Sequence, residues 1–433
     1  MSEQLETVSG PIPGEQSCEL LARLSVRESQ NVTAVSADFP VVWESASGAI
    51  VSDVDGNEYI DLTSAFGVAA VGHSNPYVAS AIADQAVRLI HGMGDVHPTE
   101  VRIELLERLA GIAPKELNRT YLATTGSEAV EVALKSAMLA TGKSAFASFR
   151  NGYHGLSFGA LRVTGIEKLR APFAAALGES TLFLEYPRAG HDGRSDADSA
   201  LERLRNALAA RDDLAALILE PIQGRGGVIV PPAGYLRGVR EICSERGIVM
   251  ILDEIWTGFG RTGSMFACEL EGVVPDILCI GKAMGGGVPI AATMGRESIM
   301  NAWPLSSGEA LHTSTFLGNP IGCAAALATI GEIERNELPA RAKQLGVTLV
   351  ARLGNLQRHK SVVDVRGRGL MWGIELTDAH AAERAVKSAL QLGVILLQAG
   401  AEGNVLSITP PLTIGERQLY RAIDILDRAL AQR

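Results

Sequence analysis

The sequence is poor in the features that several protein classes require. Charged residues make up only 20% of the 433 positions, and aromatic residues make up 5%. The net charge is −10, and the Lys and Arg residues form no cluster in the sequence. A nucleic-acid partner is not expected, because phosphate backbones are bound by concentrated positive charge. No apolar run reaches the ~18 residues of a membrane span. Residues 1–6 are acidic and lack an apolar stretch, so we also expect no secretory signal.

Cysteine is scarce as well. The five cysteines are odd in number and scattered along the chain, at Cys18, Cys243, Cys268, Cys279 and Cys323. This pattern matches neither a disulfide framework nor a zinc site. We therefore expect reduced thiols, a cytoplasmic location and no bound metal.

The chain is rich in apolar residues, at 47%, and in glycine, at 46 positions. This composition is typical of a globular protein, and the length exceeds a single hydrophobic core. Residues 1–20 contain Pro11, Pro13 and Gly14 and little apolar pattern. This predicts an N-terminal arm that is either mobile or lies over the surface of a partner. The other predicted units are an N-terminal segment contributing to the small domain at 21–75, a large domain at 76–320 and a small C-terminal domain at 321–433.

Short apolar strands alternate with helices from residue 119 onward. The expected strands are 120–123, 145–149, 182–185, 214–219, 249–252 and 277–280, and the expected helices are 127–140, 201–210 and 235–245. This alternation predicts a mainly parallel sheet with crossover helices, an α/β fold. The remaining chain is predicted as a smaller α+β domain, with helices 321–335, 339–357, 380–392 and 416–431 and strands 362–366, 370–376, 394–397 and 405–408.

The stretch 248–263 is the most informative part of the chain. It opens as a buried strand, and this strand ends at Asp253 and Glu254. Lys282 follows the next apolar strand. Ligands bind at the carboxyl edge of such sheets, and a carboxylate there needs a positive partner. Asp253 and Lys282 at one edge suggest pyridoxal phosphate, because a lysine bonds to its aldehyde and an acid keeps its ring nitrogen protonated.

Three other interpretations of this stretch compete. Residues 258–263 match G-x-G-x-x-G, but five residues separate Gly258 from the strand and no helical pattern follows, which disfavours a dinucleotide loop. A phosphate-binding P-loop is disfavoured by Ala283 and Asp276, which stand where Ser or Thr and the first Gly belong. Asp253 and Lys282 could also be the ordinary ends of unrelated strands.

Three further loops carry polar residues that suit a cofactor. Gly126 and Ser127 open a helix, where backbone amides bind phosphate, although Ser127 could simply cap that helix. Tyr153 is flanked by glycines and could lie flat on a pyridine ring, whereas His154 could simply order the loop. The hydroxyls of segment 312–320 could donate to phosphate, or the segment could be a polar linker.

Together these pieces resemble one family, from about residue 20 to the end of the chain. The resemblance rests on the motifs 125–129 (TGSEA), 153–155 (YHG), 220–224 (EPIQG), 253–263 (DEIWTGFGRTG), 281–283 (GKA), 315–320 (TFLGNP) and 410–413 (PPLT). The chain resembles the class III (ω-type) aminotransferases that depend on pyridoxal 5'-phosphate, which have the aspartate aminotransferase-like fold, PLP fold type I. The resemblance implies a homodimer with shared active sites. It also implies ping-pong transfer of an amino group from an amine or amino acid donor, with the ω-amino type favoured, to a 2-oxo acid.

The resemblance implies a role for each matching residue. Lys282 would bond to the cofactor and move the proton, and Asp253 would pair with the ring nitrogen. Tyr153 and Ile255 would pack on the two ring faces. Thr315 would reach the phosphate of the neighbouring subunit. The remaining residues expected to bind the cofactor are Thr125, Gly126, Ser127, His154, Glu220 and Trp256.

Three positions depart from the usual family pattern, and they concern the substrate. Trp256 stands where many members have Gln, and Ser407 where many have a carboxylate-binding Arg. Arg225 stands where several members have the Glu that pairs with that Arg. We hypothesise that Arg225 reads a substrate carboxylate, although it could instead point to solvent or pair with an acid. Phe66 is also expected to wall the pocket. These departures weaken α-amino acid and ornithine-like donors and favour an amine on a primary carbon, or a larger amine.

Other functions on the same scaffold stay open. An aminomutase, a racemase or a decarboxylase would use the same fold and cofactor. A cofactor-free binding protein is disfavoured, because Lys282 and Asp253 are both present.

Overall fold

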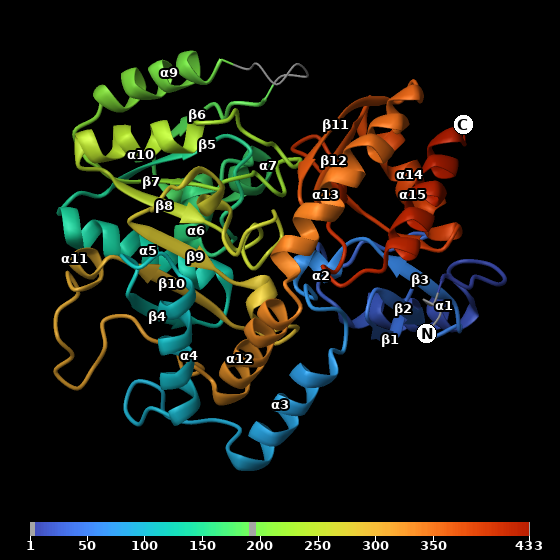
Figure 1. Ribbon diagram of the computed structural model, residues 1–433, viewed down its shortest axis with the longest axis horizontal. Helices are drawn as coiled ribbons and strands as arrows, with labels where there is room; N and C mark the ends of the chain where they lie inside the picture. Colours follow the sequence, from blue (N-terminus) through green and yellow to red (C-terminus); the bar gives the residue numbers. More distant parts are fainter. Residues whose placement is uncertain (1–4, 190–195, 433) are drawn as a thin grey trace.

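The computed structural model describes residues 5–189 and 196–432, which form two lobes (Figure 1). The large lobe is built on a seven-stranded sheet with the order β4-β10-β9-β8-β7-β5-β6. Its strands are β4 (Arg119–Ala123), β5 (Ala145–Phe149), β6 (Thr181–Leu184), β7 (Leu214–Leu219), β8 (Val249–Asp253), β9 (Ile277–Ile280) and β10 (Ala291–Gly295).

The sheet is mainly parallel, as predicted. Strands β5 to β9 pair in parallel, whereas β10 pairs antiparallel with both β9 and β4. The six predicted strands are present within one residue of their expected ends. Strand β10 was not predicted, because its sequence AATMG has small side chains in place of the β-branched and aromatic residues typical of strands.

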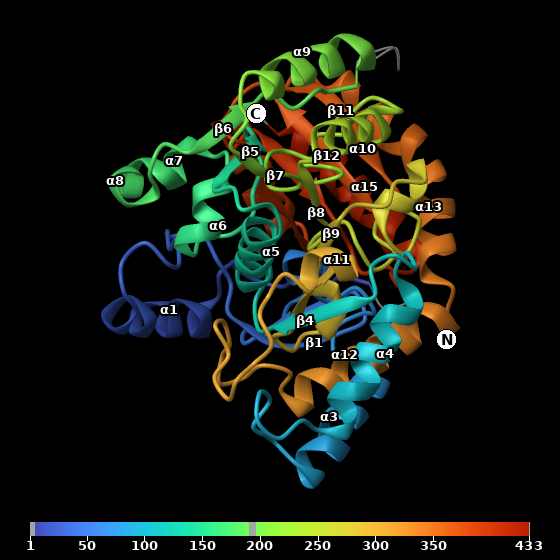
Figure 2. The same cartoon turned by 90° about the vertical axis from the view of Figure 1, so that its left-hand side faces the viewer.

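Helices cover both faces of this sheet, which explains why its strands are almost continuously apolar. On β7, Leu217 shares a cluster with Val239 of α10, whereas Ile218 shares another with Val130 of α5. The helices of this lobe are α3 (Pro76–Arg88), α4 (Glu100–Ile112), α5 (Gly126–Thr141), α6 (Phe158–Val163), α7 (Glu167–Arg170), α8 (Ala174–Leu177), α9 (Ala197–Ala209), α10 (Tyr235–Arg246), α11 (Glu297–Met300) and α12 (Pro320–Arg335). Helices α3, α4 and α12 pack together at one end of the molecule (Figures 1 and 2).

The small lobe contains two four-stranded sheets. One has the order β11-β12-β15-β14, and the other joins the N-terminal strands β1, β2 and β3 to β13. The strands are β1 (Trp43–Ser47), β2 (Ile50–Asp53), β3 (Glu58–Asp61), β11 (Val362–Arg368), β12 (Met371–Leu376), β13 (Val394–Ile395), β14 (Leu397–Ala399) and β15 (Val405–Ile408). The helices are α1 (Glu15–Arg27), α2 (Ser64–Gly67), α13 (Leu338–Gly354), α14 (Ala379–Gln391) and α15 (Glu416–Ala431).

The N-terminal segment lies against this small lobe. Within the predicted arm, the backbone of Thr7 pairs with that of Glu58 and the carbonyl of Ile12 accepts from Gln391. Helix α1 begins at Glu15, inside the stretch that was expected to be an arm. The domain boundaries remain predictions, and residues 1–4 of the arm lie outside the described residues.

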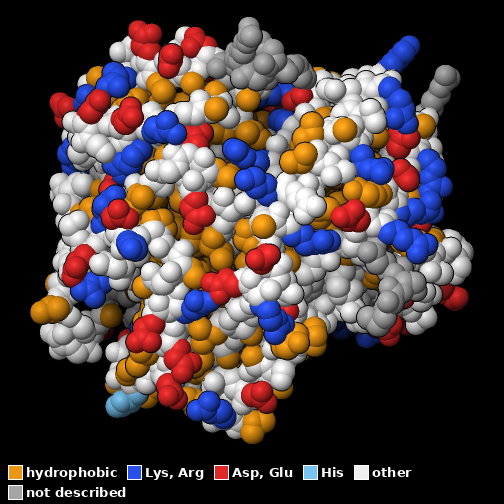
Figure 3. All heavy atoms as spheres, viewed as in Figure 1, with side chains coloured by type: hydrophobic (Ala, Val, Ile, Leu, Met, Phe, Trp, Pro, Cys, Tyr) orange, Lys and Arg blue, Asp and Glu red, His pale blue; other side chains and the backbone are white. Residues whose placement is uncertain are grey.

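Acidic and basic side chains are interspersed on the face shown in Figure 3. Of the helices that the structure describes, none combines the length and the apolar character needed to cross a membrane.

Candidate active site

Asp253 and Lys282 meet at one edge of the large sheet. Strands β8 and β9 are parallel neighbours, with Asp253 opposite Cys279, and Lys282 follows the end of β9. The prediction that these two strands end side by side is therefore confirmed. Both side chains line a cavity of about 380 Å³. Lys282 has a φ of +42°, a left-handed conformation that costs a non-glycine residue about 1–3 kcal/mol.

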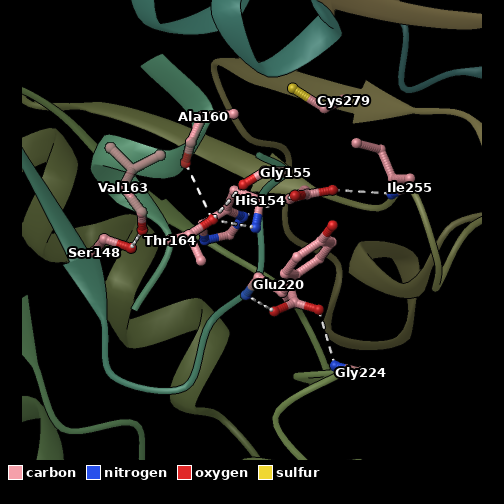
Figure 4. A network of polar contacts seen from close by, with 12 residues as sticks. Ser148, His154, Gly155, Ala160, Val163, Thr164, Glu220, Gly224, Ile255 and Cys279 are labelled. Atoms are coloured by element: carbon pink, nitrogen blue, oxygen red, sulfur yellow. Dashed lines mark hydrogen bonds and ion pairs between the residues drawn. The ribbon is translucent and has the colours of Figure 1, made fainter. Parts of the chain in front are cut away.

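His154 orients the buried Asp253 carboxylate. Nδ1 of His154 lies 2.7 Å from Oδ2 of Asp253, and Oδ1 accepts a hydrogen bond from the Ile255 amide at 3.1 Å. The hydroxyl of Thr164 accepts from the His154 amide at 3.0 Å and lies 3.0 Å from the carbonyl oxygen of Gly155 (Figure 4). His154 thus does more than order its loop, since it fixes the direction in which Asp253 presents its charge.

Glu220 is a second buried acid beside this pair. It accepts hydrogen bonds from the amides of Tyr153 at 2.9 Å and Gly224 at 2.8 Å (Figure 4). Burial raises the pKa of Glu220 to about 7, and the nearby Asp253 adds to the rise. Glu220 therefore joins the Tyr153 loop to the loop that carries Gly224.

Glu254 has a different role from its neighbour Asp253. Its carboxylate accepts from the amides of Ala267 at 2.6 Å and Cys268 at 2.8 Å, and from the Thr257 hydroxyl at 3.0 Å. Burial raises the pKa of Glu254 to about 7. This acid organises the loop after β8, and it is not among the residues that line the cavity.

The amine of Lys282 sits in surroundings that favour its neutral form. Burial lowers the pKa of Lys282 to about 8, although the charges of Asp253 and Glu220 oppose the change. Its Nζ lies 4.2 Å from the centre of the Trp256 ring. An amine of this kind is partly unprotonated near neutral pH, as a nucleophile or base must be.

The N-terminus of α5 forms another wall of the cavity. The helix begins at Gly126, and Thr125 caps it by accepting from the Glu128 amide at 3.1 Å. The alternative that Ser127 simply caps this helix is wrong, because Ser127 is already helical and its hydroxyl accepts from the amides of Leu156 and Ser157. Among the described residues, the amides of Gly126 and Ser127 have no hydrogen-bond acceptor, as expected of a helix end that can receive phosphate.

Comparison with known proteins decides the family. The family model described as "Aminotransferase class-III" matches residues 32–430. The chain belongs to the class-III aminotransferases. It is 40% identical to the acetylornithine aminotransferase of Methanosarcina mazei, over 93% of this chain and 95% of that protein. It is 38% identical to the 4-aminobutyrate aminotransferase of Mycobacterium leprae, over 99% of this chain and 98% of that protein.

A solved structure gives the same result for this class-III aminotransferase. An amine transaminase from an uncultivated Pseudomonas species, with pyridoxal phosphate bound, superposes with a TM-score of 0.86 at 32% identity. The match covers 94% of this chain and 98% of that one. The chain therefore has PLP fold type I, is an aminotransferase of the ω type, and depends on pyridoxal phosphate.

The residues around the cavity suit this cofactor. Asp253 can pair with a protonated ring nitrogen, Lys282 can bond to the aldehyde, and the amides of Gly126 and Ser127 can receive the phosphate. A side chain at Gly126 would place its Cβ 2.8 Å from Ile255, so Ile255 packs tightly against the helix end. The individual cofactor contacts of Thr125, Gly126, Ser127, Tyr153, His154, Glu220, Ile255 and Trp256 remain predictions.

Arg225 lies next to the cavity, against Tyr153, but is not among the residues that line it. It is exposed, and its guanidinium carbon lies 4.8 Å from the centre of the Tyr153 ring. No carboxylate among the described residues pairs with it, so the ion-pair alternative finds no support there. Its backbone carbonyl accepts from the amide of Gly400, which ties its loop to the small lobe.

Three other predicted site residues do not line the cavity. Phe66 is 63% exposed, and Ser407 is buried in β15 with a hydroxyl that lacks a hydrogen-bond partner among the described residues. Thr315 is exposed on the segment before α12. Within a single chain the structure therefore does not bring these residues to the cofactor cavity, and their roles remain predictions.

Sequence reasoning missed two residues that shape the site. Thr164 holds His154, and no motif marks it. The buried Arg261, within the motif 253–263, donates to the carbonyls of Leu370 and Pro410 and lies 3.5 Å from the Ser64 hydroxyl. Burial lowers the pKa of Arg261 to about 9. Arg261 joins the site loop to the small lobe.

The Ser64 hydroxyl that Arg261 approaches belongs to an unusual turn. Ser64, Ala65 and Phe66 all have positive φ values, of 49°, 47° and 64°, and Gly67 follows at 82°. The Ser64 hydroxyl donates to the carbonyl of Thr409 at 2.6 Å. We refer to residues 64–67 as the left-handed turn.

Proposed function

We propose that this aminotransferase takes its amino group from a donor whose amine lies on a terminal carbon and whose other end carries a carboxylate, which Arg225 reads. The observation that carries the proposal is the exposed guanidinium of Arg225 over the ring of Tyr153, a residue that lines the cavity, with no ion pair to a carboxylate among the described residues. An arginine binds a carboxylate with two parallel hydrogen bonds. The two relatives support the same donor class, since their names, acetylornithine and 4-aminobutyrate aminotransferase, both refer to such compounds.

The overall reaction exchanges an amine for a carbonyl. The donor R–CH2–NH2 and an acceptor R'–CO–COO⁻ yield R–CHO and R'–CH(NH2)–COO⁻. When bound, pyridoxal phosphate supplies an aldehyde that takes up the amino group and a ring that withdraws electrons. Asp253, directed by His154, would hold the proton on the ring nitrogen, and Lys282, once freed by a donor amine, would be the base that takes the proton from the donor's amine carbon.

Matched donors with and without a carboxylate test the role of Arg225. With Arg225→Ala, the KM for 4-aminobutyrate should rise about 10- to 100-fold, the loss of a hydrogen-bonded charge pair. The KM for 1-aminobutane, which lacks the carboxylate, should change less than about threefold. Loss of the cofactor's absorption band near ~400 nm on adding amine without acceptor reports each half-reaction. An equal effect on both donors would contradict the proposal.

The same measurement separates amino transfer from its rivals. A decarboxylase would release carbon dioxide from the donor, and an aminomutase or a racemase would give no oxo product in the presence of an external acceptor. A cofactor band that neither 4-aminobutyrate nor 1-aminobutane alters would favour those chemistries over the proposed one.

We also propose that two chains form a homodimer with shared sites. Supporting this, the apolar residues Ile90, Met93 and Phe316 are exposed, and His91 lies 5.3 Å from the Phe316 ring, which brings the two segments together. Thr315 adjoins this surface. An exposed cluster of this kind is typical of a protein interface. In the dimer, Thr315 would reach the cofactor phosphate of the partner.

Mixed dimers test the shared site. Thr315→Ala should weaken cofactor binding about 10- to 100-fold, the contribution of a hydrogen bond to a charged group. In a dimer of one Lys282→Ala chain and one Thr315→Ala chain, the site that keeps Lys282 receives its Thr315 from the other chain, so it should bind the cofactor as tightly as the unchanged enzyme. Weak binding in that mixed dimer, or a sedimenting mass of a single chain, would contradict the proposal.

For the location of the enzyme we propose the cytoplasm. All five cysteines are free, four of them buried, which suits a reducing compartment. Recovery of the enzyme in a non-cytoplasmic cell fraction would contradict this.

A further inference from the structure

Trp256 is clamped between two glycines from distant parts of the chain. A Cβ at Gly67, in the left-handed turn, would lie 2.7 Å from Nε1 of its indole. A Cβ at Gly224, in the loop after β7, would lie 2.3 Å from Cε3. Atoms cannot approach so closely, so any side chain at either glycine must displace the indole. The ring is thus held in a slot that exists only because both neighbours lack side chains.

Different constraints require glycine at positions 67 and 224. Gly67 has a φ of +82°, which favours glycine whatever surrounds it. Gly224 has no such conformation, and the three heavy atoms nearest to its missing Cβ all belong to Trp256. The close contact with the indole therefore explains why position 224 has no side chain.

The slot places the ring against the reacting amine. Nζ of Lys282 lies 4.2 Å from the centre of the Trp256 ring, and both residues line the cavity. A donor amine must reach the same aldehyde carbon that Lys282 reaches. The carbon that bears the donor's amine therefore comes close to the indole, on a side where the clamped ring cannot yield.

We propose that Trp256 is a specificity-determining wall that limits the reacting carbon to one extended substituent. A hydrogen or another very small group fits between that carbon and the indole, whereas the extended group points towards Arg225. This inference rests on the proposed amino transfer and adds a steric rule to it. Amines on a terminal carbon satisfy the rule, whereas amines with two sizeable substituents on the reacting carbon do not.

The first test measures the clamp without any turnover. In the full-length protein, Gly224→Ala should lower the folding equilibrium constant about tenfold or more, because overpacking a tight contact is destabilising. In a Trp256→Ala background the same change should alter that constant less than about threefold, since the three atoms nearest to the new Cβ are gone. Denaturant unfolding with and without cofactor gives both values. Gly331→Ala, an exposed helical position with nothing within 4 Å of its missing Cβ, is the matched control.

The second test measures selectivity with three amines. In 1-aminopropane, 2-aminobutane and 3-aminopentane one ethyl group stays constant while the second substituent grows from hydrogen to methyl to ethyl. In the unchanged enzyme, kcat/KM of the amine half-reaction should fall about tenfold or more with each added carbon. Trp256→Ala should reduce the whole fall to less than about tenfold. Trp256→Leu should give an intermediate fall in kcat/KM with each added carbon. Because it keeps an apolar side chain at position 256, it also controls for collapse of the site in Trp256→Ala.

The outcomes separate this inference from the proposed function. The inference would be contradicted if Gly224→Ala changed the folding equilibrium constant equally with and without Trp256. It would also be contradicted if kcat/KM fell along the amine series as steeply in both Trp256 variants as in the unchanged enzyme. If the unchanged enzyme converts neither these amines nor 4-aminobutyrate, the proposed function fails. Calorimetric binding of the three amines then decides the inference, since a wall of this kind must also discriminate among them in binding.

Discussion

Replacing Lys282 with alanine is expected to reduce amino transfer by about 10⁴-fold, the upper range for the loss of a catalytic proton-transfer group. Lys282 is the only lysine among the residues that line the cavity in the described chain. Its pKa, lowered to about 8 by burial, suits both bonding to an aldehyde and taking a proton. Steady-state kinetics with donor and acceptor at saturating cofactor measures the loss.

Three controls make this result specific to the amine. Lys282→Arg should be equally inactive, because a guanidinium stays protonated and cannot serve as base or nucleophile. Added methylamine should restore part of the activity of Lys282→Ala but not of Lys282→Arg, where the cavity stays filled. The exposed Lys115→Ala should match the unchanged enzyme. If Lys282→Ala kept more than about a tenth of the rate, Lys282 would not be the base.

The second large effect is expected at Asp253. Asp253→Asn should lower kcat/KM about 10²–10³-fold, the range for removing one preorganised electrostatic partner. The Asn oxygen can still accept from the Ile255 amide, so the shape of the site is kept while the charge that holds the ring proton is lost. Visible absorption of the loaded enzyme as a function of pH would report the altered ring protonation independently of turnover.

The adjacent acid provides the matched control for this prediction. Glu254→Gln removes a charge one residue away, but that carboxylate binds the Ala267 and Cys268 amides and does not line the cavity. It should lower stability and change kcat/KM less than about threefold, in contrast to a lost electrostatic partner. If the two substitutions had the same effect on kcat/KM, the special role of Asp253 would be excluded.

The parts of this site that depend on local pattern could be predicted from the sequence. The apolar runs of β8 and β9 and the polar residues directly after them predict that Asp253 and Lys282 share an edge, as the strand pairing shows. Strand β10 escaped prediction because its small residues carry no strand signal. The cap of α5 was misplaced because Thr125 and Ser127 are both good cap residues, and only backbone geometry decides between them.

Contacts between distant segments could not be predicted. The pairing of His154 with Asp253, the two amides on Glu220 and the slot around Trp256 each join loops from different strands. No periodicity encodes such contacts. The sequence indicated which residues are chemically able to act, whereas the structure shows which of them hold the others in place.

The left-handed turn links the two lobes mechanically. Three non-glycine residues in this conformation cost about 1–2 kcal/mol each, so the segment is held in place by its surroundings. At one end Ser64 is bonded to Thr409 of the small lobe, and at the other Gly67 abuts Trp256. A turn with so few accessible conformations transmits displacement instead of absorbing it. The turn therefore ties the position of the Trp256 indole to that of the small lobe, so a substitution that shifts Thr409 is expected to alter the selectivity that Trp256 sets.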